Sequence, residues 1–182
     1  LEEALTKEKP EGLKTLGNWP TIYEGLSKLP EEVQSSWFGF DHFYSDNSFS
    51  QALNIVFAHN PRHLMDVGGN TGRFALRCVA HSADVNVTIV DLPGQIGMMK
   101  KNIEGKEGAE RIAGYPTDLL DKTNELPKGE WDVIWMSQFL DCFSEPQIVA
   151  ILQKAAAVMN PNTRLFIMET FWDRQQYETT AL

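Results

Sequence analysis

The sequence feature that most constrains the fold is a glycine-rich turn that directly follows a short apolar run. The run Leu64–Val67 leads into residues 68–72 (GGNTG), and a helix-like pattern begins at Arg73. A strand, a glycine turn and a helix in this order bring the main chain close to a ligand at the carboxyl edge of a sheet. Because Gly68 and Gly69 lack a Cβ atom, we expect a ligand to lie directly on the backbone there.

Short apolar runs alternate with helical patterns from residue 63 onward. The expected strands are His63–Val67, Asn86–Val90, Arg111–Ala113, Asp132–Ser137 and Arg164–Glu169. The expected helices are Arg73–His81, Gly94–Ile103 and Glu145–Met159, the last beginning with a capping box of Ser144 and Gln147. Most apolar runs lack polar alternation, which is typical of strands buried on both faces of a parallel sheet. The pattern predicts an α/β fold, a doubly wound Rossmann-like sheet of at least five mostly parallel strands.

The first 60 residues differ from the rest of the chain. They are rich in aromatic residues and divided by three prolines, with helix-like spacing over Glu31–Tyr44 and Asn47–His59. We therefore expect a helical segment over residues 1–60 and a ligand-binding domain over residues 61–182. The chain opens on Leu1 and stops without a turn or capping signal, which predicts that it is cut from a longer polypeptide.

Composition excludes several classes of protein. Hydrophobic residues make up 42% and charged residues 23% of the 182, which is ordinary for a globular chain. A formal charge of -9 argues against sequence-independent binding to nucleic acid or to an anionic membrane. No apolar run approaches the ~20 residues of a membrane span, and the start of the chain lacks a signal-peptide pattern. Two cysteines are too few for a disulfide framework, which favours a reducing, cytoplasmic location.

Three aspartates follow consecutive predicted strands. Asp66 lies at the end of the first strand, Asp91 ends the second, nineteen residues beyond Gly72, and Asp118 follows the third. A dinucleotide fingerprint needs glycine where this chain has Val67, and a carboxylate at position 66 repels a pyrophosphate but suits an ammonium group. The offset of Asp91 matches a carboxylate that accepts hydrogen bonds from ribose hydroxyls, and Asp118 can accept one from an adenine amine. The three predict a nucleoside ligand with a cationic amino group, of which S-adenosyl-L-methionine is the common example.

Two segments together resemble the S-adenosylmethionine-dependent small-molecule O-methyltransferases of the caffeic-acid and hydroxyindole types: Asp66-Val67-Gly68-Gly69 and Asp91-Leu92-Pro93. The resemblance covers residues 59–172 and extends loosely back to residue 40. It implies S-adenosyl-L-methionine as cofactor, no metal, and methyl transfer to a hydroxyl of a small, aromatic acceptor. It also implies a seven-stranded sheet and an upstream domain that forms a homodimer, so this chain holds only part of the enzyme and is not expected to turn over alone.

The resemblance also implies roles for individual residues. It places Asp66, Gly68 and Gly69 around the methionine end of the cofactor, Asp91 on the ribose, Leu92 against the adenine and Asp118 near the adenine amine.

Residues 135–145 depart from the family pattern. Members carry a His-Asp-Trp-Ser run whose histidine is the general base. One alignment puts Asp141 at the histidine position, and a one-residue shift puts Leu140 there. Ser137 stands where many members have a lysine that contacts the cofactor. We expect Asp141 to replace the histidine as the base, unless it only orders the loop before Ser144.

Methyl transfer gains much of its rate from holding the acceptor oxygen in line, ~3–3.5 Å from the methyl group. A base adds ~10²–10⁴-fold, and a partly buried Asp141 would titrate above the ~3.9 of an exposed carboxyl. The missing histidine and lysine leave a second hypothesis, a cofactor-binding module without methyl-transfer activity. A nicotinamide dehydrogenase is third, because Val67 breaks its fingerprint. Cys142 and the four histidines show no nucleophile or metal-ligand pattern, so no metal site is expected.

Overall fold

A computed structural model describes residues 2–7, 9, 11–19, 22–171 and 174, without the side chains of residues 40–44. The chain forms two compact units, residues 1–44 and residues 45–182. Residues 45–60, which the sequence groups with the first segment, therefore belong to the second unit.

The helices and strands follow one another in a regular alternation after the first three helices. In chain order they are α1 (Glu2–Lys7), α2 (Ile22–Leu26), α3 (Glu31–Val56), β1 (His63–Val67), α4 (Arg73–His81), β2 (Asn86–Asp91), α5 (Pro93–Ile103), β3 (Ile112–Pro116), β4 (Val133–Ser137), α6 (Glu145–Val158) and β5 (Arg164–Met168). Short 3₁₀ turns cover Glu11–Thr15, Phe57–His59, Ala109–Arg111 and Leu140–Cys142.

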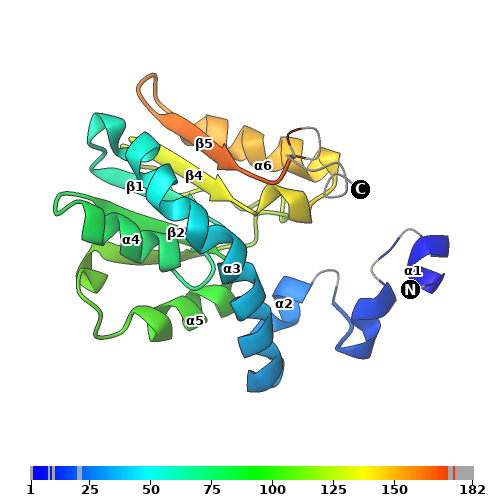
Figure 1. Ribbon diagram of the computed structural model, residues 1–182. Coiled ribbons are helices and arrows are strands. Elements are labelled where there is room, and N and C mark those ends of the chain that lie inside the picture. The colour runs from blue at the N-terminus through cyan, green and yellow to red at the C-terminus, as the bar shows by residue number, and fades with distance from the viewer. Residues whose placement is uncertain (1, 8, 10, 20–21, 172–173, 175–182) are drawn as a thin grey trace. The chain divides into compact units, whose positions relative to one another are not determined.

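The second unit is built on one parallel sheet with the strand order β3-β2-β1-β4-β5 (Figure 1). Every neighbouring pair is parallel, which confirms the predicted α/β class. The strand order reverses between β1 and β4, because β2 and β3 lie on one side of β1 and β4 and β5 on the other. Ligands of such sheets bind in the crevice at the carboxyl ends of the strands at this switch point.

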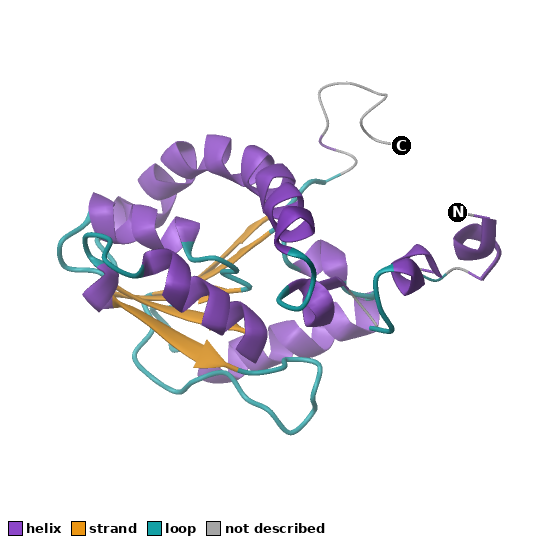
Figure 2. Ribbon diagram, turned by 90° about the horizontal axis from the view of Figure 1, so that it is seen from below, coloured by secondary structure: helices purple, strands orange, loops and turns teal. Residues whose placement is uncertain are grey.

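Helices cover both faces of the sheet, as the doubly wound prediction requires (Figure 2). On one face, α4, α5 and the C-terminal half of α3 pack against Leu64, Val87, Ile89, Val133 and Trp135. On the other face, α6 packs against the alternate residues, Met65, Val67, Val90, Ile134 and Met136. The capping box of Ser144 and Gln147 at the start of α6 is confirmed.

Two expected elements differ from the structure. The two helices expected before residue 60 are one helix, α3, followed by a 3₁₀ turn, because neither proline nor glycine interrupts the chain between Tyr44 and Asn47. The third strand lies at Ile112–Pro116 rather than Arg111–Ala113. Pro116 is tolerated because β3 is an edge strand, and Thr117 provides the next N–H that donates to β2, at Asp91 O (2.9 Å).

The first unit is small, and aromatic side chains take part in its packing. Leu26 and Leu29 are buried, and the rings of Tyr23 and Trp37 meet edge to face with their centroids 6.2 Å apart. In the described part of the chain, no helix is long and apolar enough to span a membrane.

Candidate functional site

The two loops that leave the carboxyl ends of β1 and β4 meet at the switch point. The first is the glycine loop, residues 68–72, and the second is the β4 loop, residues 138–143, which leads to α6. The N–H of Gly68 donates to Val90 O (2.8 Å), so the glycine loop begins in register with β2. The ring of Phe139, in the β4 loop, packs against Gly68.

The glycine loop has a backbone that few other residues tolerate. Gly68 (φ 76°), Asn70 (φ 50°) and Gly72 (φ 78°) all lie in the left-handed region. A Cβ atom on Gly68 would overlap the ring of Phe139, and one on Gly69 would lie 2.7 Å from Oδ2 of Asp66. The expectation that the absent Cβ atoms leave room for a ligand therefore does not hold in these directions, because the protein's own side chains fill the space.

This packing predicts that Gly68→Ala destabilises the second unit by about 1–3 kcal/mol, because the new methyl group meets Phe139 and the positive φ becomes strained. Gly97→Ala is the matched control, because Gly97 is exposed in α5 with no atom within 4 Å of its Cβ position. We expect that control to stabilise by about 0.5–1 kcal/mol, as Gly→Ala does in a helix. Urea unfolding of both variants measures the difference, and equal stabilities would contradict the packing.

Asp91 ends β2 with both carboxylate oxygens turned to backbone donors. Oδ2 accepts the N–H of Asn70 (2.9 Å) and Oδ1 accepts the N–H of Leu92 (2.7 Å). Burial raises the pKa of Asp91 to about 6, although the two N–H donors favour the charged form. An ionised carboxylate has about four acceptor sites, so each oxygen of this half-buried side chain can accept a further hydrogen bond. That capacity suits two neighbouring hydroxyls of a ribose.

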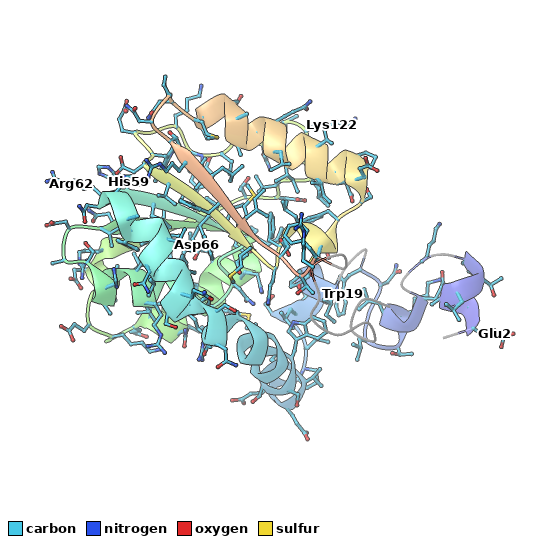
Figure 3. All side chains as sticks on the ribbon, turned by 45° about the horizontal axis from the view of Figure 1, so that its top comes forward. Glu2, Trp19, His59, Arg62, Asp66 and Lys122 are labelled. Carbon is cyan, nitrogen blue, oxygen red and sulfur yellow. The ribbon has the colours of Figure 1, made fainter. Side chains whose placement is uncertain are left out.

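Asp66 lies beneath the glycine loop, on the face of the sheet that α4 covers (Figure 3). The side chain is buried, and Oδ2 has no hydrogen-bond partner among the described residues. Burial, with a smaller effect of Asp91, raises the pKa of Asp66 to about 8. At neutral pH this carboxyl is therefore mostly uncharged, and it attracts an ammonium group only once it ionises.

Leu92 follows Asp91 at the end of β2, and Asp118 follows the end of the neighbouring strand β3. The N–H of Thr117 donates to Asp91 O (2.9 Å), which puts Asp118 just beyond that contact. The Asp118 side chain is exposed, and its Oδ1 accepts the N–H of Leu120 (2.9 Å). Leu92 is half-buried and directly precedes Pro93 at the start of α5. Both residues are thus close to Asp91 along the chain or across the β2–β3 pair, and their contact with a cofactor stays a prediction.

Ser137 ends β4, and its Oγ is buried without a hydrogen-bond partner in the described part of the chain. The next residue, Gln138, has a left-handed backbone (φ 46°), which is uncommon outside glycine and is typical of strained functional loops. Its N–H donates to Met168 O (2.9 Å), so the β4 loop starts beside the end of β5.

Glu169 follows β5 and is the residue that the sequence-based prediction missed. Its Oε1 accepts the N–H groups of Phe139 (2.9 Å) and Leu140 (2.8 Å), while Oε2 is buried without a partner among the described residues. Burial raises the pKa of Glu169, and the nearby charge of Asp141 adds to the effect. Like Asp91, this residue is an acid at the end of a predicted strand, and that signal was available in the sequence.

Asp141 lies in the β4 loop as expected, but its side chain is exposed rather than partly buried. The Sγ of Cys142 lies 3.4 Å from Asp141 Oδ1. The burial that was expected to raise the basicity of Asp141 is instead a property of Glu169.

Aromatic side chains near this site divide between the core and the β4 loop. Trp135 is buried and stacks on Phe74, with centroids 4.4 Å apart, whereas Phe139 and Phe143 meet edge to face at 4.9 Å in the β4 loop. Trp172 and the side chain of His42 lie outside the described residues. Across the described ranges, no three or more His, Cys, Asp or Glu side chains form a group that could hold a metal ion.

Comparison with known proteins gives the family. The O-methyltransferase domain family matches residues 45–181, which is most of the chain. The chain belongs to this family. Among curated relatives, it is 24% identical over 165 residues to the O-methyltransferase FrzF of Cladobotryum sp, covering 84% of this chain and 35% of that protein. It is 23% identical over 180 residues to the norreticuline-7-O-methyltransferase of Papaver somniferum, covering 97% of this chain and 46% of that protein.

Solved structures agree with the fold. The O-methyltransferase NcsB1 of neocarzinostatin biosynthesis superposes with a TM-score of 0.70 at 19% identity, over 92% of this chain and 50% of that one. That structure holds S-adenosylmethionine and 2-hydroxy-5-methyl naphthoic acid. The chain thus spans between a third and half of the length of these proteins.

Proposed function

We propose that this protein is an S-adenosyl-L-methionine-dependent O-methyltransferase that methylates a hydroxyl of a small, aromatic molecule. The observation that carries the proposal is Asp91, a half-buried carboxylate at the sheet edge with spare acceptor capacity on both oxygens, beside a left-handed glycine loop. Family membership and the NcsB1 complex with cofactor and a hydroxylated aromatic acid support it.

The residues present fit this cofactor. Asp91 would accept hydrogen bonds from the ribose hydroxyls, and Leu92 would pack against the adenine. Asp118 would accept a hydrogen bond from the adenine amine. Gly68, Gly69 and Asp66 would surround the methionine end, and the unpartnered Oγ of Ser137 would supply a further polar contact. The bound cofactor supplies an activated methyl group on a sulfonium.

The acceptor proton needs a base, and two carboxylates of the β4 loop region are candidates. One of the two alignments puts Asp141 at the position of the family's histidine, and its exposed side chain can meet an acceptor hydroxyl. Glu169 is the second candidate, because its Oε2 has no partner among the described residues and its pKa is raised. We propose Asp141 as the base, with Glu169 holding the β4 loop through Phe139 and Leu140.

We expect Asp141→Asn to lower kcat by about 100-fold or more, because a general base contributes ~10²–10⁴-fold, without changing the affinity for the cofactor. Glu169→Gln is the matched comparison, since it keeps an acceptor oxygen for the two backbone donors. Steady-state methyl transfer by the full-length protein measures both. Unchanged kcat in Asp141→Asn with a loss in Glu169→Gln would assign the base to Glu169, and no loss in either would exclude both.

The activity itself is tested by two measurements. Calorimetry with S-adenosylmethionine tests the cofactor, and transfer of labelled methyl to a panel of phenols and hydroxylated aromatic acids tests the chemistry. Binding with transfer supports the enzyme, and binding without transfer across the panel favours a cofactor-binding module. No binding refutes the proposal.

We also propose that the full-length protein is a cytoplasmic homodimer. The support is the family resemblance, together with the absence of a disulfide among the described residues, where Cys78 lies in the core and Cys142 in the β4 loop. Light scattering of the full-length protein measures the oligomeric state.

A further inference from the structure

Gln95 is a buried polar side chain on the apolar face of α5. It is 2% exposed and lies next to Ile96 and near Met99, which are core residues of the same helix. Its Nε2 donates to Asn70 Oδ1 in the glycine loop (2.9 Å). Its Oε1 is buried with no partner among the described residues, which costs free energy that an apolar side chain would not incur. Packing alone therefore does not account for a glutamine at this position.

The contact with Asn70 extends from Gln95 to the candidate ribose ligand. Asn70 has the left-handed backbone (φ 50°) that turns its own N–H toward Asp91 Oδ2 (2.9 Å). A side chain held at Oδ1 restrains this backbone, which a non-glycine residue rarely adopts. Gln95, Asn70 and Asp91 thus form a continuous hydrogen-bonded chain from α5 to the carboxylate.

We propose that Gln95 is a positioning residue for the nucleoside of the cofactor, acting through Asn70 to hold the Asp91 carboxylate in its binding orientation. This inference rests on the proposed function, because it assumes that Asp91 binds the ribose. Gln95 itself does not contact the ligand. Its loss removes one restraint on the left-handed backbone of Asn70 and so weakens the hydrogen bond from the Asn70 N–H to Asp91 Oδ2.

Asp66, on the neighbouring strand β1, is the charged group that interacts with Asp91, and Asp118 follows the other neighbouring strand, β3. The Arg73 guanidinium is paired with Asp46, and the two lysines of α5 lie in the last turn of that helix, away from its start at Pro93. The Asn70 N–H lowers the pKa of Asp91, so losing it raises that pKa further above its ordinary value. A protonated Asp91 accepts hydrogen bonds less well. As the pH is lowered, the affinity for the nucleoside therefore begins to fall at a higher pH than in the wild type.

The test is the affinity of Gln95→Leu for S-adenosylhomocysteine, measured by calorimetry between pH 5 and 8. We expect Gln95→Leu to bind S-adenosylhomocysteine about tenfold more weakly at pH 7.5, the loss that ~1.4 kcal/mol of hydrogen bonding gives. We also expect the loss of affinity on acidification to begin at a higher pH than in the wild type. We also expect a Tm no lower than that of the wild type, because the buried unpartnered oxygen is removed. Gln147→Leu, the same change in the capping box of α6, is the control and should leave affinity unchanged.

A double-mutant cycle separates positioning from general disturbance. Asn70→Gly keeps the left-handed backbone without strain but removes the Oδ1 that Gln95 contacts, so Gln95→Leu should have no further effect in that background. Wild-type affinity in Gln95→Leu, or the same loss in the Asn70→Gly background, overturns the positioning role. A wild-type protein that does not bind S-adenosylhomocysteine overturns this inference and the proposed cofactor together.

Discussion

Asp91→Ala should lower the affinity for S-adenosylmethionine by about 100-fold or more. A hydrogen bond to a charged group contributes about 1.5–3 kcal/mol, and the carboxylate has room for two ribose hydroxyls in addition to the N–H groups of Asn70 and Leu92. Calorimetry at pH 7.5 measures the loss directly. With the pKa of Asp91 at about 6, the wild-type affinity should also fall as pH drops below 6, because the protonated carboxyl accepts poorly.

Asp132 provides the control for the loss of a structural cap. Its Oδ2 accepts the N–H groups of Arg62 (2.7 Å) and His63 (2.9 Å), so it is also a carboxylate that binds two backbone donors, but at the amino-terminal end of β1. Asp132→Ala should reduce the stability of the fold without lowering the affinity for S-adenosylmethionine. Equal losses of affinity in the two variants would mean that Asp91 acts only through the fold.

The sheet was predictable because its strands are buried on both faces. Apolar runs such as Leu64–Val67 and Val133–Ser137 lack alternation, and only a covered parallel sheet buries both sides of them. The third strand was the exception, since Gly114 and Pro116 look like loop residues unless the strand is known to lie at an edge. Edge position depends on strand order, which the local sequence does not encode.

The place of Asp91 and Asp118 at the sheet edge was predictable for a similar reason. Asp91 and Asp118 follow strands, and parallel strands bring their carboxyl ends to one edge whatever the details of packing. The carboxylates near the β4 loop were less predictable, because burial decides which of them has a raised pKa. Asp141 is exposed and Glu169 is half-buried, and neither property follows from strand position. The role of Gln95 depends on a contact with a loop 25 residues away, which no local pattern reveals.

Family membership does not identify the residue that removes the proton from the acceptor hydroxyl. A carboxylate is a weaker base than the imidazole that the family's pattern has at this place. If Asp141 serves, the acceptor hydroxyl has to be acidic or well positioned, and phenols with low pKa values should be methylated fastest. Ranking the phenol panel by pKa therefore tests the base and the acceptor together.

Asp66 should make the stability of the protein fall as pH rises. The pKa of Asp66 is about 8 in the folded protein, compared with the unperturbed value of 3.8 expected in the unfolded chain. Between about pH 4 and pH 8 the folded protein therefore holds a proton that the unfolded chain releases. The unfolded state thus binds fewer protons, and the free energy of unfolding declines with rising pH across this range before levelling above pH 8. Asp91, with its pKa at about 6, adds a slope of the same sign over the narrower range between about pH 4 and pH 6.

Asp66→Asn should remove most of that slope, because an amide of the same shape carries no charge to bury. The variant should match the wild type near pH 4 and exceed its free energy of unfolding by about 2–5 kcal/mol at pH 9, an estimate from about 1.4 kcal/mol per pKa unit discounted for relaxation. Urea unfolding at pH 4, 7 and 9 measures it. A wild-type slope that persists in Asp66→Asn would show that the buried carboxyl beneath Gly69 ionises freely, and that its unpartnered oxygen finds a donor when charged.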